Sequence, residues 1–369
     1  MRDIVGSLSD WYAEGRTIGL ASVVSTSKSA PRQPGAAMAV GGQAEVAGSV
    51  SGGCVEGAVY ELATGAVETG EPVLRTFGYS DSDAFAVGLT CGGTVQVFVA
   101  PVDRERQPWL GDVFAAIEVG EPVAVATVID GAGTVGARRA VWPDRTAGDL
   151  GTEGLDFAVT DDARGMLEQG ATGLRHYGPN GERRLDDVSV FVEAFAPPPR
   201  LLVFGAIDFA AAVVRLGSML GYHVTVCDAR AVFATKARFP DADEVVVEWP
   251  HRFLARTPVD ARTIICVLTH DPKFDVPLLE VALRTPAAYV GAMGSRRTNE
   301  DRMERLREAG VGEPALARLR APIGLDLGAR TPEETAVAIA AEIISIRWGG
   351  SGEPLLMTRG AIHRPAGDA

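Results

Sequence analysis

The sequence predicts an α/β protein, with a C-terminal Rossmann-like parallel sheet domain preceded by an α+β N-terminal region. After the proline run Pro197-Pro-Pro-Arg200, short apolar runs alternate with helical patterns. This alternation is typical of parallel sheets, and the proline run is typical of a stiff linker. Before the linker, a weak internal repeat indicates a duplicated α+β fold.

Five apolar runs are the predicted strands of the C-terminal sheet: Leu201–Phe204, Val224–Cys227, Glu244–Glu248, Thr263–Leu268 and Ala287–Val290. The first two flank a helical pattern with one apolar face: Phe209, Val213, Leu216 and Leu220. A last helix is predicted to begin after Thr331, with Pro332 in its first turn and Glu334 closing a capping box. We expect its apolar stripe to pack on the sheet.

The repeat in the N-terminal half consists of small and polar residues that recur at a constant offset, such as Gly48 with Gly148 and Arg75 with Arg175. The copies differ where Gly52-Gly-Cys-Val-Glu56 is replaced by Thr152-Glu-Gly-Leu-Asp156. A loop that only one copy keeps suggests a function in that copy. The predicted organisation is an N-terminal domain (1–103), a degenerate second copy or middle domain (104–196), a linker (197–200), a Rossmann-like domain (201–349) and a tail (350–369).

Composition excludes several classes of function. With a net charge of −13 and no basic patch, the chain should repel phosphate backbones, so we expect no nucleic-acid partner. It shows no apolar run long enough for a membrane span and no secretory signal, so we expect a cytoplasmic protein. Its arginine-rich, lysine-poor and glycine-rich composition suggests a bacterial source. The cysteines are not clustered, which argues against zinc and iron–sulfur sites and favours free thiols.

The segment Ser49-Val-Ser-Gly-Gly-Cys-Val-Glu56 is a candidate ligand loop. Adjacent glycines leave backbone N–H groups open, and a helix predicted over Val55–Thr64 places Cys54 near a helix N-terminus, which favours the thiolate and attracts anions. A tight turn with a buried cysteine is the alternative. The candidate contacts are Ser51, Gly52, Gly53 and Cys54.

Two further N-terminal segments are weaker candidates. Cys91 stands beside a glycine pair before a strand predicted over Val95–Val99, and with Cys54 it could bind a soft metal or carry sulfur. A bulge or strand entry is the alternative. Arg32, in the loop Ser29–Gly35, is a candidate anion ligand, although a solvated arginine in a turn is commoner.

In the C-terminal half, Gly205-Ala-Ile-Asp208 follows the first strand, where a dinucleotide-binding fingerprint would lie. Asp228 ends the second strand, at the position of a ribose-binding acid. Ile207 occupies the place of the glycine that normally lets a pyrophosphate approach the backbone. The topology therefore predicts a nucleotide-type domain, whereas ordinary NAD(P) binding is disfavoured.

Three more polar loops end strands on the same side of this sheet, where ligands of α/β proteins bind. Each alone could be turn or cap chemistry, but together they predict a site. The candidate contacts are Gly205, Asp228, Arg230, His270, Asp271, Gly294, Ser295 and Arg296.

Taken together and in this order, these segments resemble the XdhC/CoxI family of molybdenum-cofactor maturation factors. The resembling pieces include Gly52-Gly-Cys-Val-Glu56, Cys227-Asp-Ala-Arg230, Thr269-His-Asp271 and Tyr289-Val-Gly-Ala-Met-Gly-Ser-Arg-Arg297. The family usually shows Gly-Ala-Gly-His where this chain has Gly205-Ala-Ile-Asp208. The missing glycine bears on the binding of a pyrophosphate, and the missing histidine bears on whatever role that side chain has in the family.

The resemblance implies a chaperone that binds the molybdenum pterin cofactor, protects it during sulfuration and passes it to a xanthine dehydrogenase or carbon monoxide dehydrogenase type apoenzyme. A cysteine desulfurase and a second copy of the chain are further expected partners. Genes of the family are often labelled xanthine dehydrogenase, but this chain lacks that enzyme's cysteine set and length, so we expect an accessory protein. Two alternatives stay open: an NAD(P)-dependent oxidoreductase and a docking scaffold without cofactor.

Overall fold

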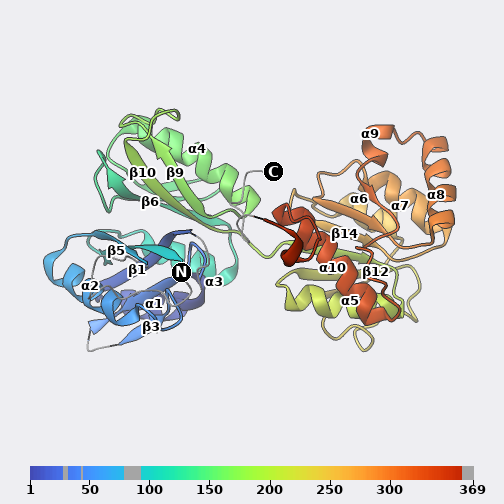
Figure 1. Ribbon diagram of the computed structural model, residues 1–369, viewed down its shortest axis with the longest axis horizontal. Coiled ribbons are helices and arrows are strands. Elements are labelled where there is room, and N and C mark those ends of the chain that lie inside the picture. The colour runs from blue at the N-terminus through green and yellow to red at the C-terminus, as the bar shows by residue number, and fades with distance from the viewer. Residues whose placement is uncertain (28–31, 43–44, 79–92, 360–369) are drawn as a thin grey trace. The chain divides into compact units, whose positions relative to one another are not determined.

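The computed structural model describes residues 1–27, 32–42, 45–78 and 93–359. The chain forms two compact units, one spanning residues 1–197 and the other beginning at Pro198 (Figure 1). Arg200, the last residue of the predicted linker, is also the first residue of strand β11 (Arg200–Phe204), and the predicted domain limits stay predictions.

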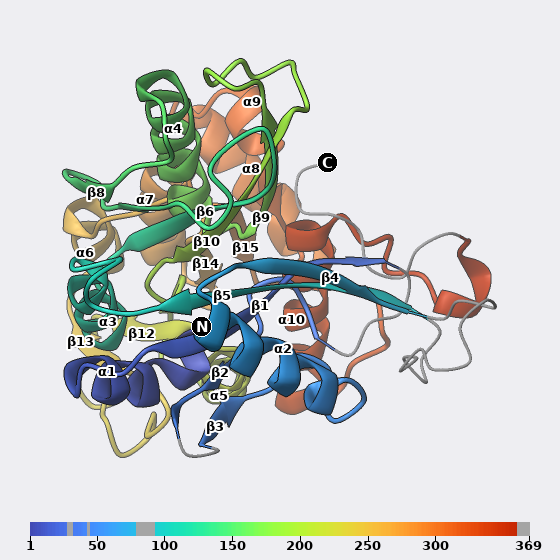
Figure 2. The same cartoon turned by 90° about the vertical axis from the view of Figure 1, so that its left-hand side faces the viewer.

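The first half of the N-terminal unit is one antiparallel sheet with helices. Its strand order is β3-β2-β1-β5-β4. Helix α2 packs its buried residues Val59, Ala63 and Ala66 on the strands β1 and β5 (Figure 2). The elements are η1 (Arg2–Ile4), α1 (Val5–Ala13), β1 (Ile18–Ser27), β2 (Ala37–Val40), β3 (Val46–Gly48), α2 (Glu56–Thr69), β4 (Val73–Phe77) and β5 (Thr94–Val102).

The second half repeats this arrangement with strand order β8-β7-β6-β10-β9. Gly48 and Gly148 end corresponding strands, and both have a left-handed backbone, with φ of +83° and +78°. The same topology with the same special glycine is what a duplication predicts. The elements are α3 (Leu110–Val119), β6 (Val123–Gly131), β7 (Arg138–Val141), β8 (Thr146–Gly148), α4 (Glu153–Gln169), β9 (Gly173–Tyr177) and β10 (Val188–Phe195).

The two halves pack on each other reciprocally. A Cβ added at Gly35 would lie 3.4 Å from Thr172, and one added at Gly136 would lie 3.3 Å from Pro72. Each half thus makes the same kind of contact with the other half, at equivalent positions. One cluster between the sheets contains Val24, Phe98, Ala100, Ile129 and Phe191, with Leu74 and Leu174 packed against it. Because the halves share their core, a domain boundary between residues 103 and 104 stays a prediction.

The C-terminal unit is a six-stranded, entirely parallel sheet with the order β13-β12-β11-β14-β15-β16. Its strands are β11 (Arg200–Phe204), β12 (His223–Asp228), β13 (Glu244–Val247), β14 (Ile264–Val267), β15 (Tyr289–Ala292) and β16 (Leu319–Arg320). The predicted Rossmann-like class is confirmed. Four predicted strands match closely, whereas the fifth begins at Tyr289 rather than Ala287.

Helices cover both faces of this sheet, so that it is doubly wound. On one face α5 and α10 lie side by side (Figure 1). On the other, α6, α7 and α8 cover Leu202, Phe204 and Ile265. The helices are α5 (Asp208–Met219), α6 (Pro250–Arg256), α7 (Pro272–Ala282), α8 (Arg296–Glu308), α9 (Glu313–Leu316) and α10 (Pro332–Trp348).

The capping box predicted at the start of the last helix is confirmed: Thr331 accepts a hydrogen bond from Glu334 N, and the Glu334 carboxylate accepts one from Thr331 N. The predicted tail contains a short helix of its own, η3 (Leu355–Met357). Among the described residues, no helix is both long and apolar enough to cross a bilayer.

Candidate functional site

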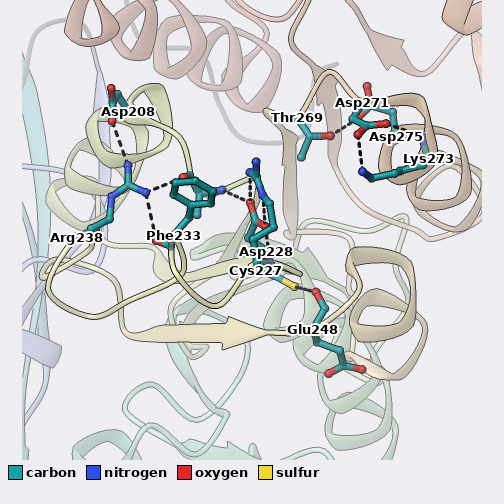
Figure 3. Close-up of polar contacts among 12 residues, drawn as sticks. Asp208, Cys227, Asp228, Phe233, Arg238, Glu248, Thr269, Asp271, Lys273 and Asp275 are labelled. Atoms are coloured by element: carbon teal, nitrogen blue, oxygen red, sulfur yellow. Dashed lines mark hydrogen bonds and ion pairs between the residues drawn. The ribbon is translucent and has the colours of Figure 1, made fainter.

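The candidate site lies at the carboxyl edge of the C-terminal sheet, where the parallel strands β11, β12, β14 and β15 end. Figure 3 shows residues of the loops after β11, β12 and β14. The connections from β11 and β14 run in opposite directions across the sheet. Doubly wound proteins bind ligands at such a switch point. The topology therefore brings Gly205, Asp228, Asp271 and Ser295 to one edge, as predicted.

The loop after β11 packs closely on the neighbouring strand. Gly205 has a φ of +106°, and a Cβ there would lie 2.9 Å from the backbone nitrogen of Thr269. Glycine is required at this position by packing. Ile207 is the N-cap of α5, and its half-buried side chain packs against the core.

Asp228 is bound by groups of the protein itself. It is 3% exposed, and its carboxylate accepts hydrogen bonds from Ala206 N at 2.8 Å, Arg230 N at 2.9 Å and the Arg230 guanidinium at 2.8 and 2.9 Å. Burial disfavours the charged form, but the bonds from Arg230 and Ala206 outweigh it and lower the pKa of Asp228. The carboxylate is therefore ionised and already saturated, and a ribose hydroxyl would have to displace one of these donors.

Arg238 closes the same loop from the other side. Its guanidinium bonds Asp208 Oδ1 at 3.1 Å and the Ala206 carbonyl at 3.2 Å. Both Arg230 and Arg238 also lie over the ring of Phe233, at 4.7 and 5.5 Å from its centroid. Figure 3 shows this group beside the Asp228 cluster. Asp208, at the position where the resemblance implies a histidine, pairs with Arg238, and its own side chain is 87% exposed.

The loop after β14 starts helix α7. Asp271 is its N-cap and accepts a hydrogen bond from Lys273 N, while the Lys273 ammonium lies 2.9 Å from the same carboxylate. The Lys273 contacts lower the pKa of Asp271. His270 is exposed. Of the predicted contacts in this loop, His270 is exposed, and the Asp271 side chain, 46% exposed, caps the helix and pairs with Lys273.

The loop after β15 starts helix α8. Ser295 is the N-cap, and its hydroxyl accepts a hydrogen bond from Thr298 N at 3.1 Å. Arg296 and Arg297 are exposed in the first turn, which contains no acidic residue. Beneath the loop, buried Arg302 donates to the Met293 carbonyl and pairs with Asp275 at 3.0 Å. The sequence patterns did not predict this buried pair.

In the N-terminal unit, the candidate loop has a different character from the one predicted. The Glu56 carboxylate accepts hydrogen bonds from the backbone nitrogens of Ser51, Gly53 and Val55 and from both nearby serine hydroxyls. The glycine-rich backbone therefore surrounds the chain's own carboxylate, and the prediction of open N–H groups was wrong. Burial opposes ionisation, but these bonds lower the pKa of Glu56 to about 2.

Cys54 remains a candidate within this loop. Helix α2 begins at Glu56 with Val55 as its N-cap, so Cys54 does lie at the helix N-terminus, as predicted, and it is half-buried. Cys91 and residues 28–31 lie outside the described residues, so the proximity of the two thiols stays a prediction. The described part of the chain contains no group of three or more histidine, cysteine or acidic residues that could hold a metal.

The other described cysteines, Cys227 and Cys266, are free and buried. Burial raises the pKa of each thiol to about 12, so both are protonated at neutral pH. They are core residues, as expected of unclustered cysteines.

In the second copy, Asp156 stands where the first has Glu56. Its carboxylate accepts a hydrogen bond from Leu150 N at 2.8 Å and pairs with Arg139 at 3.1 Å. Arg139 also donates to the Gly148 carbonyl and Thr160. The degenerate copy thus keeps the acid but lacks the thiol, and an arginine replaces the serine hydroxyls as its partner.

Arg32 lines a pocket of about 470 Å³ in the N-terminal unit. Glu193, which is buried, lies at its inner wall. A nearby charge was also missed: Arg138 is buried, and its Nε has no hydrogen-bond partner among the described residues. Burial lowers the pKa of Arg138 to about 10, with Glu193 opposing the shift. The sequence contains no signal for Glu193 or Arg138, because a charged residue is ordinary in a strand where polar and apolar residues alternate.

The fold and the site define a class of protein. In it, a duplicated α+β unit is joined to a doubly wound unit, and the protein groups that usually contact a dinucleotide bond to one another instead. Comparison with known families identifies this class. Residues 201–343 match the family described as "XdhC Rossmann domain", and residues 11–78 and 116–178 match the "XdhC and CoxI family". The chain belongs to the XdhC and CoxI family.

Three known proteins show the extent of the similarity. A protein of Bacillus subtilis that is named as a probable xanthine dehydrogenase subunit is 26% identical, over 89% of this chain and 92% of that protein. "Molybdenum cofactor insertion chaperone PaoD" of Escherichia coli is 26% identical, over 90% and 84%. A crystal structure of a xanthine dehydrogenase from Bacillus halodurans matches with a TM-score of 0.66 and 25% identity, over 94% and 96% of the two chains.

Proposed function

We propose that this protein binds the molybdenum pterin cofactor and inserts it into a molybdoenzyme of the xanthine dehydrogenase or carbon monoxide dehydrogenase type. The observation that carries the proposal is the similarity to a molybdenum cofactor insertion chaperone over 90% of this chain and 84% of that protein. The compartment we propose is the cytoplasm, and the target enzyme is proposed by class alone.

The chemistry of the site supports a carrier rather than a catalyst. The acidic side chains at the sheet edge are engaged: Asp228 with Arg230, Asp271 with Lys273, and Asp275 with Arg302. A general base needs an accessible lone pair within reach of its substrate. Groups that are fixed in ion pairs position a ligand but do not readily exchange its protons.

The thiol of Cys54 supplies a second contact in this proposal. A soft thiolate at a helix N-terminus suits the molybdenum–sulfur end of the cofactor. A cysteine desulfurase would then be the partner that delivers sulfur, and a second copy of this chain is a further proposed partner. Cys54→Ser is the informative variant, because it nearly keeps the size of the side chain while replacing the soft thiol ligand with a hydroxyl.

The experiment is to express the full chain in cells that make molybdopterin and to assay the purified protein for molybdenum and for pterin fluorescence. We expect both at near-stoichiometric amounts. Cys54→Ser should lower the molybdenum content, whereas Cys227→Ser, at a buried thiol, serves as the matched control once its folding is verified. Absence of metal and pterin from the wild-type protein would refute the proposal.

The doubly wound topology favours one alternative, an NAD(P)-dependent oxidoreductase. The internal bonding of Asp228 and Ala206 weakens it, since these are the groups that a dinucleotide would contact. Titration with NADPH, followed by its fluorescence, tests this alternative: saturable binding would favour the oxidoreductase, and the absence of binding would count against it. Co-purification of an apoenzyme from cofactor-deficient cells, without any bound pterin, would instead favour a docking scaffold.

A further inference from the structure

We infer that the loop between β15 and α8 is a phosphate site, which takes a phosphate-ester group of the cofactor. We call residues 293–297 the Gly294 loop. The inference rests on the proposed function for the identity of the natural ligand. The geometry of the loop supports the phosphate chemistry independently.

The first argument concerns the place where a doubly wound protein usually holds phosphate, the loop after the first strand. Here Ala206 N donates to Asp228, the Ala206 carbonyl accepts from Arg238, and Ile207 N donates to the Gly205 carbonyl. The loop's backbone groups at Ala206 and Ile207 are therefore already bonded, and the first turn of α5 carries the carboxylate of Asp208, which disfavours an anion there. An anion at this edge of the sheet needs another loop.

The Gly294 loop offers the required donors. An α-helix leaves its first N–H groups without intrahelical partners, and its N-terminus carries partial positive charge. The Ser295 hydroxyl satisfies the N–H of Thr298. In the described structure the backbone N–H groups of Arg296 and Arg297 remain available, and α8 is 13 residues long. Both arginine side chains are exposed beside them.

A buried guanidinium beneath the loop points independently to a ligand. Arg302 is 4% exposed, and its Nη2 lies 3.5 Å from the position that a Cβ on Gly294 would take. Its Nη2 bonds Asp275 and the Met293 carbonyl, but its Nη1 is buried with no hydrogen-bond partner in the described part of the chain. A buried, unpaired N–H of a charged group is costly. Because Nη2 of the same guanidinium lies under Gly294, a phosphate oxygen that enters above Gly294 would come close to this positive charge.

Gly294 keeps the approach to Arg302 open. Its φ of +151° is one that side-chain-bearing residues rarely adopt, and a Cβ there would lie 3.3 Å from Thr298. A side chain would fill the space above the guanidinium. The loop therefore combines a helix N-terminus, two exposed arginines and one buried arginine, a combination that suits the oxygens of a phosphate ester.

The test uses inorganic pyrophosphate as the probe, titrated calorimetrically into the full-length protein at fixed ionic strength. We expect Arg296→Ala to weaken binding about tenfold or more, because charge-assisted hydrogen bonds to phosphate are strong. Arg305→Ala is the matched control: this arginine is exposed in the last turn of the same helix. It makes the same change of charge away from the loop, and it should alter binding less than twofold.

The inference would be overturned by the absence of pyrophosphate binding in the wild-type protein, or by equal weakening in both variants, which would indicate unspecific attraction. Arg302 is left intact, since its loss could unfold the unit. Cofactor loading separates the two proposals. If wild type carries molybdenum and pterin and Arg296→Ala carries as much, this inference fails and the chaperone role stands. If the wild-type protein carries neither molybdenum nor pterin but pyrophosphate binds at the loop, the phosphate site stands and the chaperone role fails.

Discussion

Asp275 and Arg302 form an ion pair of 3.0 Å in which each side chain is 3% exposed. The other carboxylate oxygen of Asp275 accepts a hydrogen bond from the Thr269 hydroxyl. Because Thr269 follows β14, Asp275 lies in α7 and Arg302 in α8, this pair connects two loops of the candidate site. The site's geometry therefore depends on a buried contact beneath its loops.

The first prediction concerns this pair. Asp275→Asn leaves a buried guanidinium without its counter-charge, so the free energy of unfolding should fall by about 3–5 kcal/mol, as for other broken buried pairs. Urea unfolding, followed by circular dichroism, measures the loss. Asp271→Asn is the control, because its pair with Lys273 is largely exposed and should contribute at most about 1 kcal/mol. Equal losses in the two variants would contradict the assigned role.

The second prediction concerns Glu56 and pH. Its pKa in the folded protein, about 2, lies below the ordinary value of 4.5. The charged carboxylate therefore stabilises the fold above pH 4.5, and this contribution is lost as the pH falls toward 2. We expect it to be about 1–2 kcal/mol after allowance for solvent screening.

The measurement is the melting temperature of wild type and Glu56→Gln from about pH 2 to neutral pH. The difference between the two melting temperatures should be largest at neutral pH and should shrink as the pH falls toward 2. Taking this difference cancels the contribution of the other carboxylates. A difference that stays constant with pH would show that packing, rather than charge, stabilises the loop.

These two cases show what the sequence can and cannot predict. Strands β11 and β12 and the capping box at Thr331 follow from local patterns, so they were predictable. In the glycine-rich loop, the carboxylate of Glu56 competes with any outside ligand for the backbone N–H donors. The sequence pattern reveals these donors, but it does not show which acceptor binds them. Arg302 lies among many charged residues of α8; its spacing of four from buried Leu306 was the one available signal.

The third prediction tests the duplication. A Cβ at Gly48 would lie 2.2 Å from the Ala37 carbonyl, and one at Gly148 would lie 2.4 Å from the Arg138 carbonyl. Gly48→Ala and Gly148→Ala should therefore destabilise the protein similarly, each by more than the roughly 1 kcal/mol of left-handed strain alone. Gly120→Ala is the control, since Gly120 has a φ of +75° but open space around its Cβ position. Chemical unfolding of the three variants measures the losses. If Gly148→Ala behaved like Gly120→Ala, the two copies would not be structurally equivalent.

The last prediction concerns Ile207. If this side chain alone prevented dinucleotide binding, Ile207→Gly would restore it. The structure predicts otherwise, because Ala206 N and Asp228 remain bonded to each other and Arg238 still holds the Ala206 carbonyl. Ile207→Gly should therefore lose about 1–2 kcal/mol of stability through lost core contact, without gaining NADH affinity. Thermal unfolding and NADH fluorescence titration of the same sample test both parts. Tight NADH binding by the single variant would show that Asp228 exchanges its internal donors easily, and would identify the side chain of Ile207 as the one barrier to a dinucleotide.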